Sequence, residues 1–213
     1  MSVDIVIVGA GGFGRECAST AAARNRAFPD SIRVLGVLDA SPSTRNLERL
    51  EALSMPYLGT PEDWIAGAVD AEHVIAIGDP TVRSRIAEQF AVHGRTAHTL
   101  VHPGASIGEE SVLAPGVVVC AGATVSTNVV LERMVHVNPG AVVGHDSILR
   151  EYVSVNPGAV ISGDVLVESQ ALIGAGAVVL QGLRIGTGSV VGAAACVVRD
   201  VPDRVTVKGV PAR

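Results

Sequence analysis

The chain has 213 residues and is 48% hydrophobic but only 3% aromatic, so small aliphatic side chains must fill its core. A formal net charge of −5 argues against nucleic-acid binding, and no Lys/Arg run suits an anionic membrane surface. We identify no secretory signal and no apolar stretch of transmembrane length without Gly, Pro or charge. The three widely spaced cysteines (Cys17, Cys120 and Cys196) are expected to be buried, small apolar residues in a reducing compartment, so a cytoplasmic protein of one or two domains is predicted.

Residues 1–98 are predicted to form a small Rossmann-like α/β domain with a parallel sheet. Apolar runs indicate strands, and the segments between them have helix-forming composition or helix-start signals. In chain order we predict a strand at 3–8, a helix at 15–26, a strand at 34–38, a helix starting at Pro61 with Thr60 as N-cap, a strand at 74–77 and a helix at 81–93.

A glycine-rich segment follows the first predicted strand and opens the first predicted helix. Gly9, Gly11 and Gly14 fit the pattern G-x-G-x-x-G, whose backbone N–H groups can bind a diphosphate. Asp39 ends the second strand, where an acid contacts the ribose in dinucleotide-binding folds. Alone, the pattern indicates NAD binding, but about three strands make only half of such a fold. A tight strand–helix turn without a ligand is the other interpretation.

Residues 99–213 follow a six-residue repeat. Every sixth residue from Val101 to Val197 is Val, Ile or Leu, and the residue two positions earlier is usually small. This repeat is typical of a parallel β-helix, in which three hexads form a triangular coil of about 18 residues with the aliphatic residues inside. Roughly five coils fit between Val101 and Val197, with no large loop leaving the stack. Glycine often follows the aliphatic residue, and we expect unusual backbone angles at Gly108, Gly144, Gly174, Gly186 and Gly192.

The hexads, the closing residues 207–212 (VKGVPA) and the glycine-rich α/β domain together resemble the hexapeptide-repeat acyltransferases. Within that superfamily, the whole chain is similar to the bacterial sugar O- and N-acetyltransferases related to sialic acid O-acetyltransferase and to the UDP-4-amino-sugar and GDP-perosamine N-acetyltransferases. The resemblance implies a left-handed β-helix and acetyl-CoA as co-substrate, with no metal. It also implies a sugar or nucleotide-sugar acceptor and a homotrimer with active sites between the prisms.

Acyl transfer from a thioester needs a general base and a hydrogen-bond donor for the oxyanion. The resemblance implies that His145 is this base and that Asp146 orients it, although the family more often has Glu at the second position. Gly163 follows one full coil later, so it should stack on His145. The resemblance implies that the N–H of Gly163 binds the acyl carbonyl oxygen. The family commonly has a second His where this chain has Ser154. Either Ser154 makes a lighter contact with acetyl-CoA, or that contact is missing.

The other predicted site residues also come from the resemblance. Coenzyme A is expected in a groove between neighbouring prisms, where Ala175, Ala193 and Lys208 would contact it. The glycine-rich loop is expected to bind the acceptor instead of NAD. The predicted acceptor-binding residues are Gly9, Gly11, Gly12, Phe13, Gly14, Asp39, Gly78 and Asp79. His102 and His136 are expected to lie at the surface or to pack in a trimer interface, with no catalytic role.

Several functions compete with a sugar acetyltransferase. A γ-type carbonic anhydrase needs three zinc-binding histidines, two of them five residues apart. His136 and His145 are nine apart, so we reject that function. A nicotinamide oxidoreductase would give the β-helix no role. A non-catalytic trimer that binds nucleotide sugars and acyl transfer to a non-sugar molecule both stay open, as does the choice between a hydroxyl and an amine acceptor.

Overall fold

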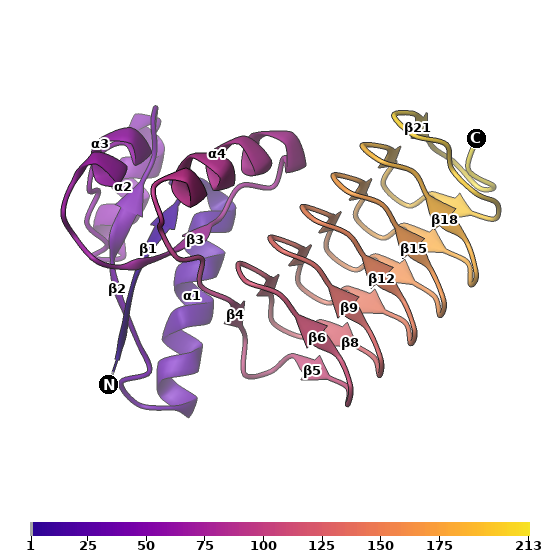
Figure 1. Cartoon of the computed structure of the whole chain (residues 1–213), viewed down its shortest axis with the longest axis horizontal. Helices are drawn as coiled ribbons and strands as arrows, with labels where there is room; N and C mark the ends of the chain where they lie inside the picture. Colours follow the sequence, from indigo (N-terminus) through magenta and orange to yellow (C-terminus); the bar gives the residue numbers. More distant parts are fainter. Residues whose placement is uncertain (1) are drawn as a thin grey trace.

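The computed structural model describes residues 2–213. Figure 1 shows an N-terminal α/β domain lying beside the first coils of a long stack, with the C-terminus at the far end. The domain contains a three-stranded parallel sheet in the order β2-β1-β3, so the first strand is central. Its elements are β1 (Val3–Val8), α1 (Gly12–Ala27), β2 (Ile32–Leu38), α2 (Thr44–Ala52), α3 (Pro61–Ala66), β3 (Glu72–Ile75) and α4 (Pro80–Val92).

The helix starts follow from the sequence. The hydroxyl of Thr60 accepts a hydrogen bond from the N–H of Asp63, which confirms Thr60 as the N-cap of α3. Asp79 caps α4 in the same way. The sequence prediction missed α2, whose N-cap is Ser43, and it placed the third strand two residues too late.

The rest of the chain is a left-handed parallel β-helix of two-residue strands. Its three faces are parallel sheets of seven, six and five strands. The first face consists of β4 (Leu100–Val101), β7 (Val118–Val119), β10 (His136–Val137), β13 (Ser154–Val155), β16 (Leu172–Ile173), β19 (Val190–Val191) and β21 (Thr206–Val207). The second consists of β5 (Ser106–Ile107), β8 (Thr124–Val125), β11 (Val142–Val143), β14 (Val160–Ile161), β17 (Val178–Val179) and β20 (Cys196–Val197). The third consists of β6 (Val112–Leu113), β9 (Val130–Leu131), β12 (Ile148–Leu149), β15 (Leu166–Val167) and β18 (Arg184–Ile185).

The stacking register confirms the predicted coil. His136 pairs with Ser154, and Val179 pairs with Val197, so the two partners of each pair are one predicted coil apart. Each predicted aliphatic position from Val119 to Val197 is buried. The stack continues beyond Val197, the last predicted aliphatic position, and its last coil is shorter, because Val191 pairs with Val207.

The corner glycines correct one prediction. Gly108, Gly144 and the other glycines that follow the aliphatic residue do not have positive φ angles. Instead, a Cβ on Gly144 would lie 2.5 Å from the backbone of the next coil, so close stacking requires glycine there. The left-handed conformation falls three residues after each aliphatic position from Ile107 to Val191, and Asn128 (φ 56°) and Asp146 (φ 61°) adopt it. Asn and Asp tolerate this conformation better than most residues.

The first face of the β-helix packs against the α/β domain. Leu100, Val118 and Cys120 of this face share an apolar cluster with Cys17 of α1. Cys17 and Cys120 are buried as predicted, whereas Cys196 is half-buried. The α/β domain therefore covers only one of the three faces.

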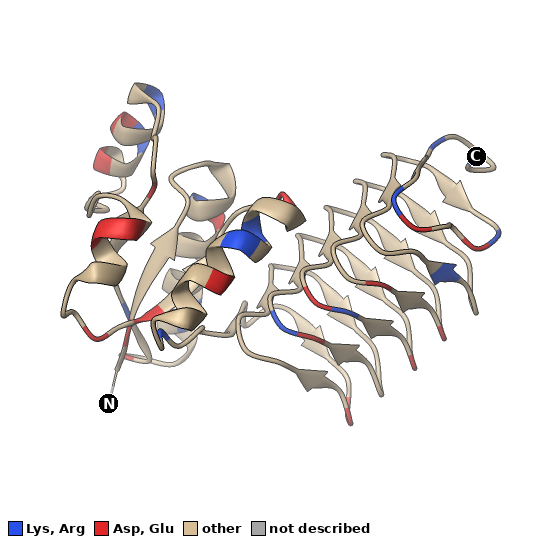
Figure 2. Cartoon of the chain, turned by 45° about the horizontal axis from the view of Figure 1, so that its top comes forward, with Lys and Arg blue, Asp and Glu red and all other residues tan. Residues whose placement is uncertain are grey.

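Charged residues avoid the strands of the β-helix. Figure 2 shows that they gather on the helices of the α/β domain and on the turns between strands. Arg184 is the one Lys, Arg, Asp or Glu residue within strands β4–β21. Within residues 2–213, the structure contains no helix that is both long and apolar enough to cross a membrane.

Candidate functional site

His145 and Asp146 form a hydrogen-bonded pair on an edge of the β-helix. The Nδ1 atom of His145 lies 2.6 Å from Oδ2 of Asp146. Asn128, one coil earlier, donates from Nδ2 to the other carboxylate oxygen at 2.7 Å. Because a carboxylate only accepts, the pair requires the imidazole proton on Nδ1, which leaves Nε2 with its lone pair.

The hydrogen bonds to Asp146 also keep it charged. The hydrogen bond from Asn128 contributes most, followed by the one from His145, and both lower the pKa of the Asp146 carboxyl group. The side chains of His145 and Asp146 are 62% and 50% exposed in the single chain. The imidazole is therefore oriented by its neighbours while remaining open to a ligand.

Gly163 lies against the imidazole, as the coil length predicts. A Cβ at this position would lie 2.5 Å from both Cε1 and Nε2 of His145, so any other residue would displace the ring. A Cβ on Gly144 would in turn lie 2.6 Å from the nitrogen of Gly163. Among residues 2–213, the N–H of Gly163 makes no backbone hydrogen bond. The two glycines thus leave an imidazole nitrogen and a free backbone N–H at one place.

The position of this site relative to the α/β domain follows from the order of the faces. His145 lies between β11 of the second face and β12 of the third face. The α/β domain covers the first face, so the catalytic candidate lies on the edge opposite that domain. His136 and Ser154, which precede and follow His145 by half a coil each, lie on the covered face.

A cavity of about 490 Å³ opens in the α/β domain at the carboxyl ends of its strands. Parallel α/β sheets usually bind ligands at this end. Gly9 and Asp39 line the cavity, together with Glu62 of α3 and Arg85 and Gln89 of α4. The cavity thus combines apolar walls with carboxylate, guanidinium and amide groups.

The glycine-rich loop has the close contacts that its pattern predicts. A Cβ on Gly14 would lie 1.9 Å from the carbonyl oxygen of Gly9. By contrast, Gly11 has no neighbouring atom within 4 Å of a built Cβ, and the nearest such atom to Gly12 is at 3.9 Å. Asp39 accepts hydrogen bonds from the N–H groups of Ala10 and Ser41, so it holds the loop against β2.

Two of the other predicted acceptor residues, Phe13 and Gly78, contact the β-helix. The ring of Phe13 packs on His136 with 4.9 Å between ring centroids. The carbonyl oxygen of Gly78 accepts from the hydroxyl of Ser154, and Asp79 caps α4. The expectation that His136 lies at the surface or at a trimer interface is wrong, because the residue is 1% exposed and is buried between the domains of one chain.

The structure separates Ser154 from the catalytic candidate. Ser154 is fully buried beneath the α/β domain and is hydrogen-bonded to both Gly78 and Arg83. In this conformation it cannot touch a ligand at His145, so the expected lighter contact with acetyl-CoA is corrected to a contact between domains. The physical reason is that the two residues are half a coil apart, which places Ser154 on the opposite side of the prism.

Ala175, Ala193 and Lys208 lie together on a different edge from His145. Ala175 and Ala193 are in the turns between the first and second faces, and Lys208 follows β21 at the same corner. All three are exposed. The second face separates this edge from the edge that carries His145.

Two features of the site were missed by the sequence analysis. Asn128 lies one coil before Asp146, so the coil length alone would have identified it. Arg83 is fully buried between the domains and hydrogen-bonds to both. No periodic signal marks an arginine of a helix as buried. Within the described part of the chain, no group of three His, Cys, Asp or Glu residues could hold a metal ion.

Comparisons with known proteins cover the whole chain. Residues 4–90 match the family model of the PglD N-terminal domain. The acetyltransferase domain of PglB from Neisseria gonorrhoeae FA1090, in complex with acetyl coenzyme A, is 30% identical with a TM-score of 0.86, covering 100% of this chain and 99% of that chain. PerB from Caulobacter crescentus, in complex with CoA and GDP-perosamine, is 31% identical with a TM-score of 0.84, covering 99% of this chain and 96% of the other.

WeeI from Acinetobacter baumannii AYE is 27% identical with a TM-score of 0.82, covering 100% of this chain and 99% of that chain. No curated protein matches the chain in a sequence search.

Proposed function

Because this chain belongs to the family of sugar acetyltransferases that have a PglD N-terminal domain, we propose that it transfers an acetyl group from acetyl-CoA to the amine of a nucleotide-linked sugar. The observation on which the proposal depends is the His145–Asp146 pair stacked against Gly163. The related PglB domain binds acetyl coenzyme A, and PerB binds CoA with GDP-perosamine. These two complexes support the choice of donor and acceptor.

The site geometry suits a direct transfer. The acceptor nitrogen attacks the thioester carbonyl carbon while Nε2 of His145 removes its proton, and the N–H of Gly163 donates to the oxyanion. The carbon–sulfur bond then breaks, and the coenzyme A thiolate takes the proton from the imidazolium. Asp146 fixes the tautomer of the neutral imidazole and stabilises the imidazolium that forms. The products are the sugar amide and free coenzyme A.

In this proposal, residues 1–98 bind the acceptor and residues 99–213 carry out the acetyl transfer. The nucleotide would occupy the 490 Å³ cavity, where Arg85 supplies a positive charge and Asp39 and Glu62 supply acceptors. The N–H groups at the start of α1, beside Gly11 and Gly12, would bind the diphosphate.

The active site in this proposal is shared between copies of the chain. Within one chain, the acceptor domain covers the first face, while His145 lies on the opposite edge. An acceptor held by one chain therefore reaches the imidazole of a neighbouring chain. Coenzyme A would lie between the two, along the edge of Ala175, Ala193 and Lys208.

The two faces beside His145 are suited to packing against other copies. Their outward-facing positions are mostly aliphatic, as in Val142 and Val160 of the second face and Ile148 and Leu166 of the third face. Val112 of the third face is 56% exposed in the single chain. Adjacent apolar faces of this kind mark protein–protein contacts, and we propose a homotrimer.

The test measures free thiol released from acetyl-CoA in the presence of UDP- or GDP-linked 4-amino sugars, with mass spectrometry of the sugar product. We expect a mass gain of one acetyl group on an amino sugar and none on the corresponding 4-hydroxy sugar. His145→Ala should reduce kcat by about 100-fold or more because it removes the general base. The oligomer should remain intact by light scattering. Thiol release without acetylated sugar, or a fully active His145→Ala variant, would contradict the proposal.

A further inference from the structure

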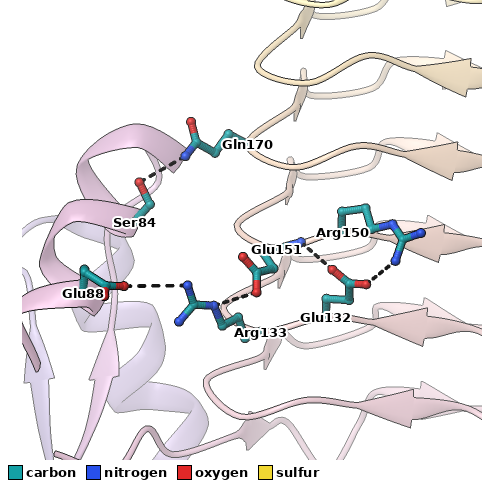
Figure 3. Close-up of polar contacts among 7 residues, drawn as sticks. All are labelled: Ser84, Glu88, Glu132, Arg133, Arg150, Glu151 and Gln170. Carbon is teal, nitrogen blue, oxygen red and sulfur yellow. Dashed lines mark hydrogen bonds and ion pairs between the residues drawn. The ribbon is translucent and has the colours of Figure 1, made fainter. Parts of the chain in front are cut away.

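Polar side chains of helix α4 contact the turns of the β-helix along a line that we call the seam. Figure 3 shows the solvent-facing contacts of this seam. Ser84 accepts a hydrogen bond from Gln170 at 3.3 Å, and Glu88 lies 3.8 Å from Arg133. Arg133 in turn pairs with Glu151 on the next coil at 2.8 Å. These side chains are partly exposed, so each pair contributes little to stability.

Arg83 lies beneath these solvent-facing contacts and is 0% exposed. No carboxylate pairs with its guanidinium group in residues 2–213. Its nitrogens instead donate to oxygen atoms of both domains at 2.6–3.3 Å. The acceptors are the carbonyl oxygens of Ile77, Gly78, Met134, Tyr152 and Val153 and the hydroxyl oxygen of Ser154.

These acceptors define what Arg83 connects. Ile77 and Gly78 belong to the turn between β3 and α4, whereas Met134 and Tyr152 occupy equivalent corners of two successive coils. Ser154 closes the connection, because its hydroxyl donates to Gly78 while it accepts from Arg83. A planar guanidinium with several fixed donors can hold such a set in one geometry, whereas a single ammonium cannot.

The opposite side of α4 lines the acceptor cavity. Val82, Arg85, Ile86 and Gln89 recur at helical spacing and face that cavity. Arg83 and the outer pairs are on the side of the same helix that faces the β-helix. A shift of α4 along the seam would therefore move the cavity wall relative to the edge that holds His145.

We propose that Arg83 is a positioning residue, which fixes the acceptor cavity on the β-helix and thereby sets where the acceptor amine meets the imidazole of the neighbouring copy. This inference rests on the proposed function. Arg83 contacts no reacting atom, and its effect is transmitted through α4 and the turn at Gly78. The charge is retained because six oxygen atoms replace its lost hydration.

The test compares two acceptors in the full-length protein. A nucleotide-linked amino sugar uses the cavity, whereas a small free amine at high concentration needs only His145 and acetyl-CoA. For Arg83→Met we expect kcat with the nucleotide sugar to fall about tenfold or more, because misplacement by about 1 Å has effects of this size or larger. The rate with the free amine and the KM for acetyl-CoA should stay within about twofold.

Two variants serve as references. Arg83→Lys keeps the charge but lacks the planar fork, so we expect it to restore part of the lost rate. Glu88→Gln removes an outer contact of the same helix and should leave both acceptors unaffected. If Arg83→Met fails to fold, Arg83→Lys and Ser154→Ala allow the same comparison of acceptors.

Equal losses with both acceptors, or unchanged kinetics with the nucleotide sugar, would show that Arg83 only supports the fold and would overturn the inference. A wild-type protein that transfers acetyl groups to no nucleotide-linked amine would instead overturn the proposed function itself, and this inference with it.

Discussion

At the scale of single residues, the candidate catalytic site consists of the side chains of Asn128, His145 and Asp146 and of Gly163, which has no side chain. Asn128 and Asp146 occupy equivalent left-handed corners of successive coils, which brings their side chains within hydrogen-bonding distance. Asp146 then holds Nδ1 of His145, and Gly163 leaves space for the ring. The length of one coil in the sequence thus places all of these groups together.

Asp146→Asn tests the orienting role. An amide can donate to Nδ1 and so favour the wrong tautomer, and it cannot stabilise an imidazolium. We expect kcat to fall at least about tenfold, while the melting temperature stays close to that of the wild type because Asp146 is exposed. Asp164→Asn, which changes an exposed acid at the equivalent left-handed corner of the next coil, is the matched control. Equal activities of Asp146→Asn and the wild type would exclude the role.

At this scale the sequence predicted the pair His145–Asp146 and the stacking of Gly163, because both depend only on chain neighbours and on the repeat length. It failed for Ser154, whose role was inferred from the family pattern. Burial under another domain cannot be deduced from the hexad pattern, which describes contacts between coils only. Arg83 was missed for the same reason.

At the scale of elements, the β-helix was predictable in register because each inward aliphatic residue packs on its equivalent in the next coil. The corner glycines were correctly placed but wrongly explained. Their role is to permit close stacking, whereas Asn, Asp, Gly and even Tyr152 occupy the left-handed positions. In the α/β domain, the short helix α2 was not predicted, because Ser43 was not recognised as its N-cap.

The glycine-rich loop gives a prediction at this scale. Gly11 has space for a side chain and no positive φ angle, so Gly11→Asp should leave the fold intact. Its carboxylate would repel a diphosphate at the start of α1. We expect the acceptor KM to rise about tenfold or more and the acetyl-CoA KM to stay the same. Gly11→Asn, which has nearly the same size but no charge, should have a smaller effect. Similar values for the two variants would rule out an anion at this position.

At the scale of the whole molecule, acid should weaken the fold through two buried histidines. Burial lowers the pKa of His73 to about 4 and that of His136 well below its usual value. Below about pH 6.5 the unfolded chain gains protons on these rings while the folded chain does not, so the free energy of unfolding falls. His73 alone should account for about 2 kcal/mol between pH 7 and pH 5.

Urea unfolding at these two pH values measures the effect. In a His73→Phe variant, the fall in the free energy of unfolding between pH 7 and pH 5 should lose most of the His73 contribution. A pH-independent free energy of unfolding in the wild type would show that these rings are not neutral and buried.

For the whole molecule, we propose that an acceptor bound to the α/β domain of one chain reacts at His145 of a neighbouring chain. The most direct measurement mixes two impaired variants, His145→Ala and Gly11→Asp, by co-expression or by joint refolding, and assays them at an acceptor concentration well below the wild-type KM. In randomly mixed oligomers, about one quarter of the interfaces pair an intact His145 with an intact loop, so about a quarter of the wild-type rate should return. If the mixture is no more active than its components, each chain must act on its own acceptor, and the account of a shared site is wrong.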